Sequence, residues 1–120
     1  MANGERLLIQ DSSGKIQTAK SEDEYILYLG LVAEDLEFLY EFGLFGGHRT
    51  LGGISIDFAV WAPFLTGVEV QSKWWHRNSS KERYRAAIIS SYFGKPPVYF
   101  VEEETENLGT VRPAIKRKLK

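Results

Sequence analysis

The chain has 120 residues, 43% of them hydrophobic and 13% aromatic, which is enough for one compact domain and too little for two of ordinary size. It contains no cysteine, so disulfides and thiolate metal sites are excluded and any metal would need oxygen or imidazole ligands. There is no apolar run of about eighteen residues and no signal-peptide pattern, so we expect a cytoplasmic protein that does not enter the membrane.

The net charge of −1 conceals an uneven distribution of charged side chains. Residues 1–70 carry 4 basic and 11 acidic side chains, whereas residues 71–120 carry 11 and 5. A basic half beside an acidic pocket suits a metal-dependent nuclease, because lysines and arginines bind phosphates while carboxylates bind cations. Chance asymmetry is the alternative explanation.

The first half of the chain predicts a helix followed by strands. Residues 1–20 are polar, with a turn at residues 11–14, and predict an N-terminal arm or hairpin, whereas residues 21–120 predict a single domain. Ser21 and the acids after it predict the start of a helix that ends near Val32. A strand over residues 38–42 and a glycine-rich loop over residues 43–53 follow.

Two further strands are expected around a turn at residues 62–64. Ile54, Ile56, Phe58 and Val60 alternate with small or polar residues, a period of two that predicts a strand with one buried face. The next strand is expected to begin at Gly67 and to carry its polar residues on one face.

The second half predicts a helix, a buried strand and a helical tail. The helix begins near residues 78–80 and ends at Gly94, and its basic residues are expected to face outward: Lys81, Arg83 and Arg85. The apolar run at residues 98–101 predicts a strand covered on both faces. The order helix, three strands, helix, strand predicts an α/β sandwich with a mixed sheet, because the last helix-to-strand unit is a crossover.

Asp57 and Glu69 are the first candidates for chemistry. Each is expected in a strand, away from the apolar face, and consecutive strands are usually neighbours in a sheet. Two carboxylates at that separation repel each other, so either one is protonated or a divalent cation lies between them. We favour the cation, which would activate a water for attack on a phosphodiester. Lys73 and Gln71 lie on the same strand face, within reach of that water or of a phosphate.

The sequence also resembles the PD-(D/E)xK nuclease superfamily over roughly residues 20–118. It is most similar to small phage and bacterial nucleases related to very-short-patch repair and Holliday-junction-type enzymes. The resemblance rests on residues 52–58 (GGISIDF), residues 68–71 (VEVQ), and the pair Trp75 and His76. It implies a restriction-endonuclease-like αβββαβ core, with a central mixed sheet flanked by helices.

The resemblance also implies roles for individual residues. Asp57, Glu69 and the Val70 carbonyl would bind Mg²⁺, for which Mn²⁺ can substitute, and Glu24 would be the acid of the first helix. Gln71 stands where the superfamily usually has a lysine, and Lys73 could replace that lysine. His76 would lie at the edge of the site; the alternative is a structural histidine that caps the strand. Ile56 stands where the superfamily name has proline.

DNA contacts are assigned to basic residues near the proposed site. A solvated turn is the alternative for Arg49, and a soluble helix face is the alternative for the helical residues. The assigned residues are Arg49, Lys73, Arg77, Lys81 and Arg85.

The favoured function is therefore a magnesium-dependent DNA endonuclease. The alternative is a catalytically inactive DNA-binding or structural relative of the nuclease fold. Such a relative could be a subunit of a larger phage or mobile-element assembly. A homodimer is plausible, because many such folds pair two sites to cut two strands.

Overall fold

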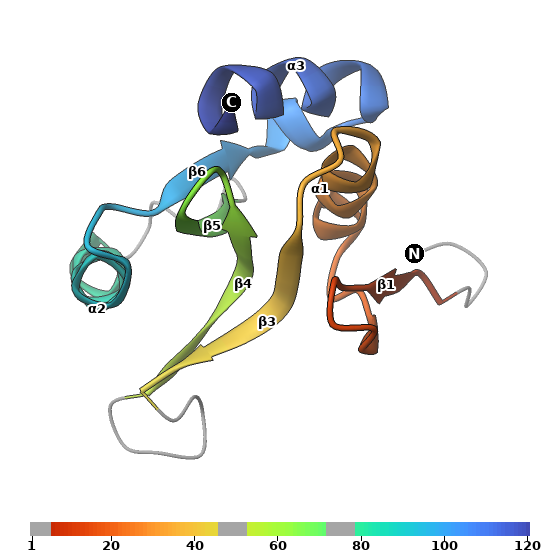
Figure 1. Ribbon diagram of the computed structural model, residues 1–120. Coiled ribbons are helices and arrows are strands. Elements are labelled where there is room, and N and C mark those ends of the chain that lie inside the picture. Colours follow the sequence, from red (N-terminus) through yellow and green to blue (C-terminus); the bar gives the residue numbers. More distant parts are fainter. Residues whose placement is uncertain (1–5, 46–52, 72–78) are drawn as a thin grey trace.

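The computed structural model describes residues 6–45, 53–71 and 79–120. Along the chain the elements are β1 (Leu8–Gln10), β2 (Ile16–Thr18), α1 (Glu22–Ala33), β3 (Phe38–Leu44), β4 (Ile54–Trp61), β5 (Leu65–Gln71), α2 (Ser79–Phe93), β6 (Val98–Val101), the 3-10 helix η4 (Glu102–Thr105) and α3 (Leu108–Leu119) (Figure 1).

A four-stranded mixed sheet in the order β3-β4-β5-β6 organises the fold. β3, β4 and β5 are antiparallel, whereas β5 and β6 are parallel, with Val68 beside Val98. A parallel pair needs a crossover connection, which α2 supplies between β5 and β6. The expected α/β class, with a mixed sheet flanked by helices, is confirmed.

Helices cover both faces of the sheet. Figure 1 shows α1 and α3 together on one side and α2 on the other. The core on the α1 side is the larger and includes Leu27, Leu31, Phe38, Phe58, Phe100, Val111 and Ile115. The smaller core beneath α2 contains Leu44, Ile56, Ala59 and Ile89.

The helix boundaries agree with the capping signals in the sequence. The Ser21 Oγ caps α1 by accepting a hydrogen bond from the Glu24 N–H at 3.2 Å. α2 ends immediately before Gly94, whose φ of 75° lies in the left-handed region that glycine adopts readily. None of the helices in the described parts of the chain is long and apolar enough to cross a membrane.

Gly67 lies within β5, which begins two residues earlier, so the prediction that this glycine begins the strand is wrong. Its role is in packing rather than in chain reversal. A Cβ added at Gly67 would lie 2.8 Å from Ile89 Cγ2 and 2.9 Å from Phe93 Cε2. The missing side chain therefore allows α2 to pack closely on the sheet.

The sequence pattern predicted that the apolar residues of β4 lie on one continuous buried face, and this prediction is wrong. Phe58 belongs to the core on the α1 side, whereas Ile56 belongs to the core beneath α2. The neighbouring strand β3 shows the same switch between cores. Tyr40, which is paired with Phe58, packs in the core on the α1 side, whereas Phe42, which is paired with Ile56, packs against the core beneath α2. Between them Glu41 has a φ of 54°, a left-handed conformation that interrupts the two-residue period.

The N-terminal segment forms an antiparallel β1–β2 hairpin attached to the main core. Ile9 is fully buried there. The turn expected at residues 11–14 is confirmed by a hydrogen bond from the Gly14 N–H to the Asp11 carbonyl at 2.9 Å. The Ser12 hydroxyl accepts from the Phe38 N–H at 2.8 Å, which joins the turn to β3.

Candidate functional site

Two carboxylates bridge the point where β4 and β5 stop pairing. The strand ladder extends from Trp61 and Leu65 as far as Phe58 and Val68. One residue beyond this pair, the Asp57 N–H donates to Glu69 Oε2 at 3.1 Å, and the Val70 N–H donates to Asp57 Oδ2 at 2.8 Å. The carboxylates therefore take the place of main-chain acceptors that a continuous ladder would supply. The strands that carry the two acids are neighbours, as the sequence predicted. The carboxylates turn to different partners, Glu69 toward Arg85 of α2 and Asp57 toward Glu24.

Glu69 faces α2, and its counter-charge is Arg85. The Glu69 side chain is 2% exposed, and its Oε1 accepts from Arg85 Nε. Arg85 Nη2 also donates to the Ser55 carbonyl. The prediction that Arg85 faces outward is therefore wrong, because a carboxylate this deeply buried needs a charged partner. Burial lowers the pKa of Arg85, but the nearby acids, Glu69 foremost, together outweigh it and raise that pKa.

Gln71 also faces α2. Its Nε2 donates to Glu82 Oε1 at 2.9 Å. Gly67, Glu69 and Gln71 thus share one face of β5. The prediction that the polar residues of this strand lie on one face is confirmed for Glu69 and Gln71, whereas Lys73 lies outside the described residues.

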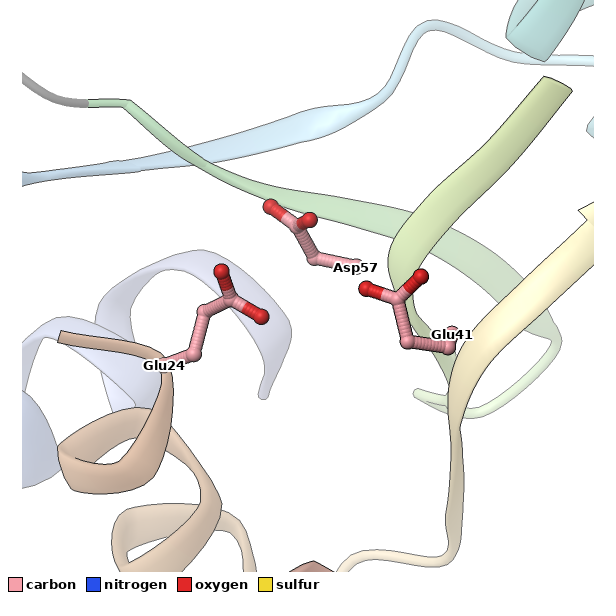
Figure 2. A group of neighbouring side chains, drawn as sticks. All are labelled: Glu24, Glu41 and Asp57. Atoms are coloured by element: carbon pink, nitrogen blue, oxygen red, sulfur yellow. The ribbon is translucent and has the colours of Figure 1, made fainter. Parts of the chain in front are cut away.

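A second set of carboxylates converges on Asp57 from the α1 side. Glu24 in α1, Glu41 in β3 and Asp57 in β4 each offer an oxygen, and these three oxygens lie within 4.8 Å of one another. Figure 2 shows the three side chains pointing into a common space from the three elements. We call these three residues the acidic centre. It contains two of the predicted site residues, Asp57 and Glu24.

Glu41 is the member of the acidic centre that sequence reasoning missed. It stands in an apolar strand, where strict alternation would place it on the face opposite Tyr40. Its positive φ instead brings it to the same side, so that both residues approach Glu24. The one available signal was an isolated acid in the run of residues 38–42, and nothing in the sequence indicated the reversed backbone.

Lys20 and Tyr40 surround the acidic centre. The Lys20 ammonium lies 2.6 Å from Glu41 Oε1 and 3.7 Å from Asp57 Oδ1. The Tyr40 hydroxyl donates to Glu24 Oε1 at 2.5 Å and accepts from the Lys20 N–H at 3.1 Å. The main chain of Lys20 is thereby fixed beside the three carboxylates.

Burial and mutual repulsion make this centre reluctant to carry full negative charge. Burial, reinforced by the charges of Glu69 and Glu24, raises the pKa of Asp57 to about 8. Burial likewise raises the pKa of Glu24, although the hydrogen bond from Tyr40 opposes the change. Burial lowers the pKa of Lys20, but the nearby acids, Glu41 foremost, outweigh it and raise that pKa.

The acidic centre fits a hard divalent cation. Such ions take carboxylate oxygens, and a bound cation would relieve the repulsion that now favours a proton on Asp57. Glu69, an expected ligand together with the Val70 carbonyl, faces α2 instead. Both Glu69 oxygens already accept hydrogen bonds, so a metal on Oε1 would require Arg85 to release it. Their role as metal ligands stays a prediction.

The remaining predicted site residues carry basic or imidazole side chains. Lys81 is exposed in the first turns of α2. The following lie outside the described residues: Arg49, Lys73, His76 and Arg77.

An α/β domain with a buried acidic centre between a helix and two strands is thus what the chain forms. No protein-family model matches it, and no curated protein or solved structure matches it at a significant level.

Proposed function

We propose that this protein is a metal-dependent endonuclease that hydrolyses DNA phosphodiester bonds on a restriction-endonuclease-like core. The element order supports this proposal. From α1 to β6 the chain runs helix, three strands, helix, strand, with the last two strands parallel. This is the order implied by the resemblance to PD-(D/E)xK nucleases.

The observation that carries the proposal is the convergence of Glu24, Glu41 and Asp57 within 4.8 Å. These three residues would hold Mg²⁺ or Mn²⁺. The ion, when bound, would lower the pKa of a water and neutralise charge on phosphate oxygens.

The chain's own residues would orient the site. The hydrogen bond from the Val70 N–H holds the Asp57 carboxylate against β5, and the bond from the Asp57 N–H holds the Glu69 carboxylate against β4. Tyr40 fixes Glu24 in the same way. Preorganised carboxylates of this kind reduce the rearrangement needed when a cation and a phosphate bind.

DNA would be bound by basic side chains of the second half of the chain. Arg85 is engaged with Glu69, so in this proposal its main role is to neutralise that acid. Phosphate contacts then fall to Lys81 and to the other basic residues assigned from the sequence: Arg49, Lys73 and Arg77. A role for His76 at the edge of the site, a homodimer that cuts two strands and a cytoplasmic location remain expectations of the same proposal.

The second candidate is a DNA-binding or structural relative of the nuclease fold that has no catalytic activity. Such a relative could act as a subunit of a larger assembly. The observation that favours it is Gln71, which stands at the usual lysine position and is hydrogen-bonded to Glu82 on the α2 side. A neutral amide held in that way supplies no positive charge to the acidic centre.

Cleavage of supercoiled, linear and branched DNA with Mg²⁺ or Mn²⁺ separates the two candidates. We would compare the wild type with Asp57→Asn and Glu41→Gln, and with Glu103→Gln as a control at an exposed acid of η4. Cutting by the wild type and the control, lost in both site variants, supports the endonuclease. An inert wild type that still binds DNA supports the second candidate as a DNA-binding relative. A protein that neither cuts nor binds DNA contradicts the endonuclease and leaves only the structural relative.

A further inference from the structure

The acidic centre already contains a positive charge, the ammonium of Lys20. This ammonium lies 2.6 Å from Glu41 and 3.7 Å from Asp57, whose oxygens belong to the group of three. It therefore lies next to two of the carboxylates that a divalent cation would use. Two cations cannot approach the same carboxylates closely without strong repulsion.

Two features of Lys20 would allow its ammonium to move away from the acidic centre. Its main chain is held, because the Lys20 N–H donates to the Tyr40 hydroxyl at 3.1 Å. Its side chain is 56% exposed, whereas the Asp57 side chain is 12% exposed. The long, flexible lysine side chain can therefore swing into solvent while the carboxylates stay in place.

The local charge leaves room for a divalent ion. Among the residues that the structure describes, four carboxylates, those of Glu24, Glu41, Asp57 and Glu69, face two cationic side chains, Lys20 and Arg85. Arg85 is bound between Glu69 and the Ser55 carbonyl on the α2 side, so it cannot move to the other acids without leaving Glu69 unpaired. Within residues 6–45, 53–71 and 79–120, Lys20 is thus the cationic side chain paired with Glu41 and Asp57.

We propose that Lys20 is the resident counter-ion of the acidic centre and that a divalent cation binds there by displacing its ammonium. This inference rests on the acidic centre being the metal site of the proposed function. It adds an exchange step: Lys20 stabilises the protein before metal binds and competes with the metal. Removal of the lysine charge should then weaken the metal-free fold and tighten metal binding.

The test measures Mn²⁺ binding by calorimetry and thermal unfolding with and without Mn²⁺, so it does not depend on DNA cleavage. We would compare the wild type with Lys20→Met and with Lys20→Arg, which keeps the charge. Lys15→Met is the matched control, because Lys15 is an exposed lysine in the hairpin that precedes Lys20. Asp57→Asn identifies binding that does not involve the acidic centre.

We expect Lys20→Met to bind Mn²⁺ about tenfold more tightly than the wild type, as loss of a unit charge a few ångströms away implies. Its melting temperature should fall without metal and recover when Mn²⁺ is added. Lys20→Arg and Lys15→Met should bind like the wild type.

Unchanged or weaker Mn²⁺ binding by Lys20→Met, in a protein whose binding needs Asp57, would overturn the exchange and leave the proposed metal site intact. Absence of Mn²⁺ binding in the wild type and in Lys20→Met would reject both the exchange and the metal site. Exchange without DNA cleavage would support the inference and contradict only the endonuclease.

Discussion

The carboxylates of Asp57 in β4 and Glu69 in β5 each accept a hydrogen bond from a main-chain N–H of the other strand. The Asp57 N–H donates to the Glu69 carboxylate at 3.1 Å, and the Asp57 carboxylate accepts from the Val70 N–H at 2.8 Å. The two acids therefore hold β4 and β5 together where the ladder stops. They also repel each other, and this conflict governs the behaviour that we expect of the site.

Asp57→Asn should flatten the dependence of stability on pH. The pKa of Asp57 rises from 3.8 to about 8 on folding, so between these values the folded state holds the proton more tightly than the unfolded state. The free energy of unfolding contributed by Asp57 therefore falls as pH rises through this window, by at most about 1.4 kcal/mol per pH unit. Asparagine keeps an acceptor for the Val70 N–H and has no proton to lose.

Urea unfolding of the wild type and Asp57→Asn at several pH values between about 4 and 8 checks this expectation. The free energy of unfolding of Asp57→Asn, relative to that of the wild type, should increase as pH rises. Glu103→Gln, which changes an exposed acid by the same chemistry, should track the wild type. Parallel curves for the wild type and Asp57→Asn would show that Asp57 does not titrate in this window.

Arg85→Met should destabilise the protein by roughly 3 kcal/mol or more, because it leaves the Glu69 carboxylate buried without a counter-charge. The second change Glu69→Gln should recover much of this loss, since it removes the uncompensated charge. Chemical denaturation of the two single variants and the double variant measures the coupling. Additive effects of the two changes would mean that the ion pair contributes nothing to stability. Arg83→Ala is the control, because Arg83 is exposed in the same helix and its loss should cost little stability.

Glu41→Asn should raise the stability of the metal-free protein by about 1 kcal/mol, because asparagine tolerates a positive φ better than glutamate does. Glu41→Gln removes the same charge and keeps the backbone strain, so the difference between the two variants isolates the backbone effect. Both lose the ion pair to Lys20, so this loss cancels when the two variants are compared. Equal melting temperatures for the two variants would contradict the strain argument.

Gly67→Ala should destabilise the protein by about 1–3 kcal/mol, because its Cβ would lie 2.8 Å from Ile89 Cγ2 and force α2 away from the sheet. The change Ile89→Ala should cost less in the Gly67→Ala background than in the wild type, since the smaller side chain makes room for the new methyl group. A double-mutant cycle by thermal unfolding measures this difference, and independent effects would contradict the close packing of α2 on β5.

Local signals in the sequence determined the elements and their order. Ser21 and Gly94 mark helix ends because a capping hydroxyl and a left-handed glycine act within a few residues of themselves. The apolar runs predicted the strands, and the crossover predicted the parallel pair. The pairing of Asp57 with Glu69 followed from two consecutive strands, each carrying one acid.

Only the tertiary structure decided which side chains surround Asp57. Glu41 joins the acidic centre because its backbone takes a left-handed conformation, and the two-residue period of a strand assumes that it does not. Lys20 and Arg85 are placed by contacts between segments that are 37 and 16 residues apart from their partners Asp57 and Glu69 along the chain. A buried carboxylate selects its counter-charge from whatever the fold brings close, and spacing along the sequence does not encode that choice.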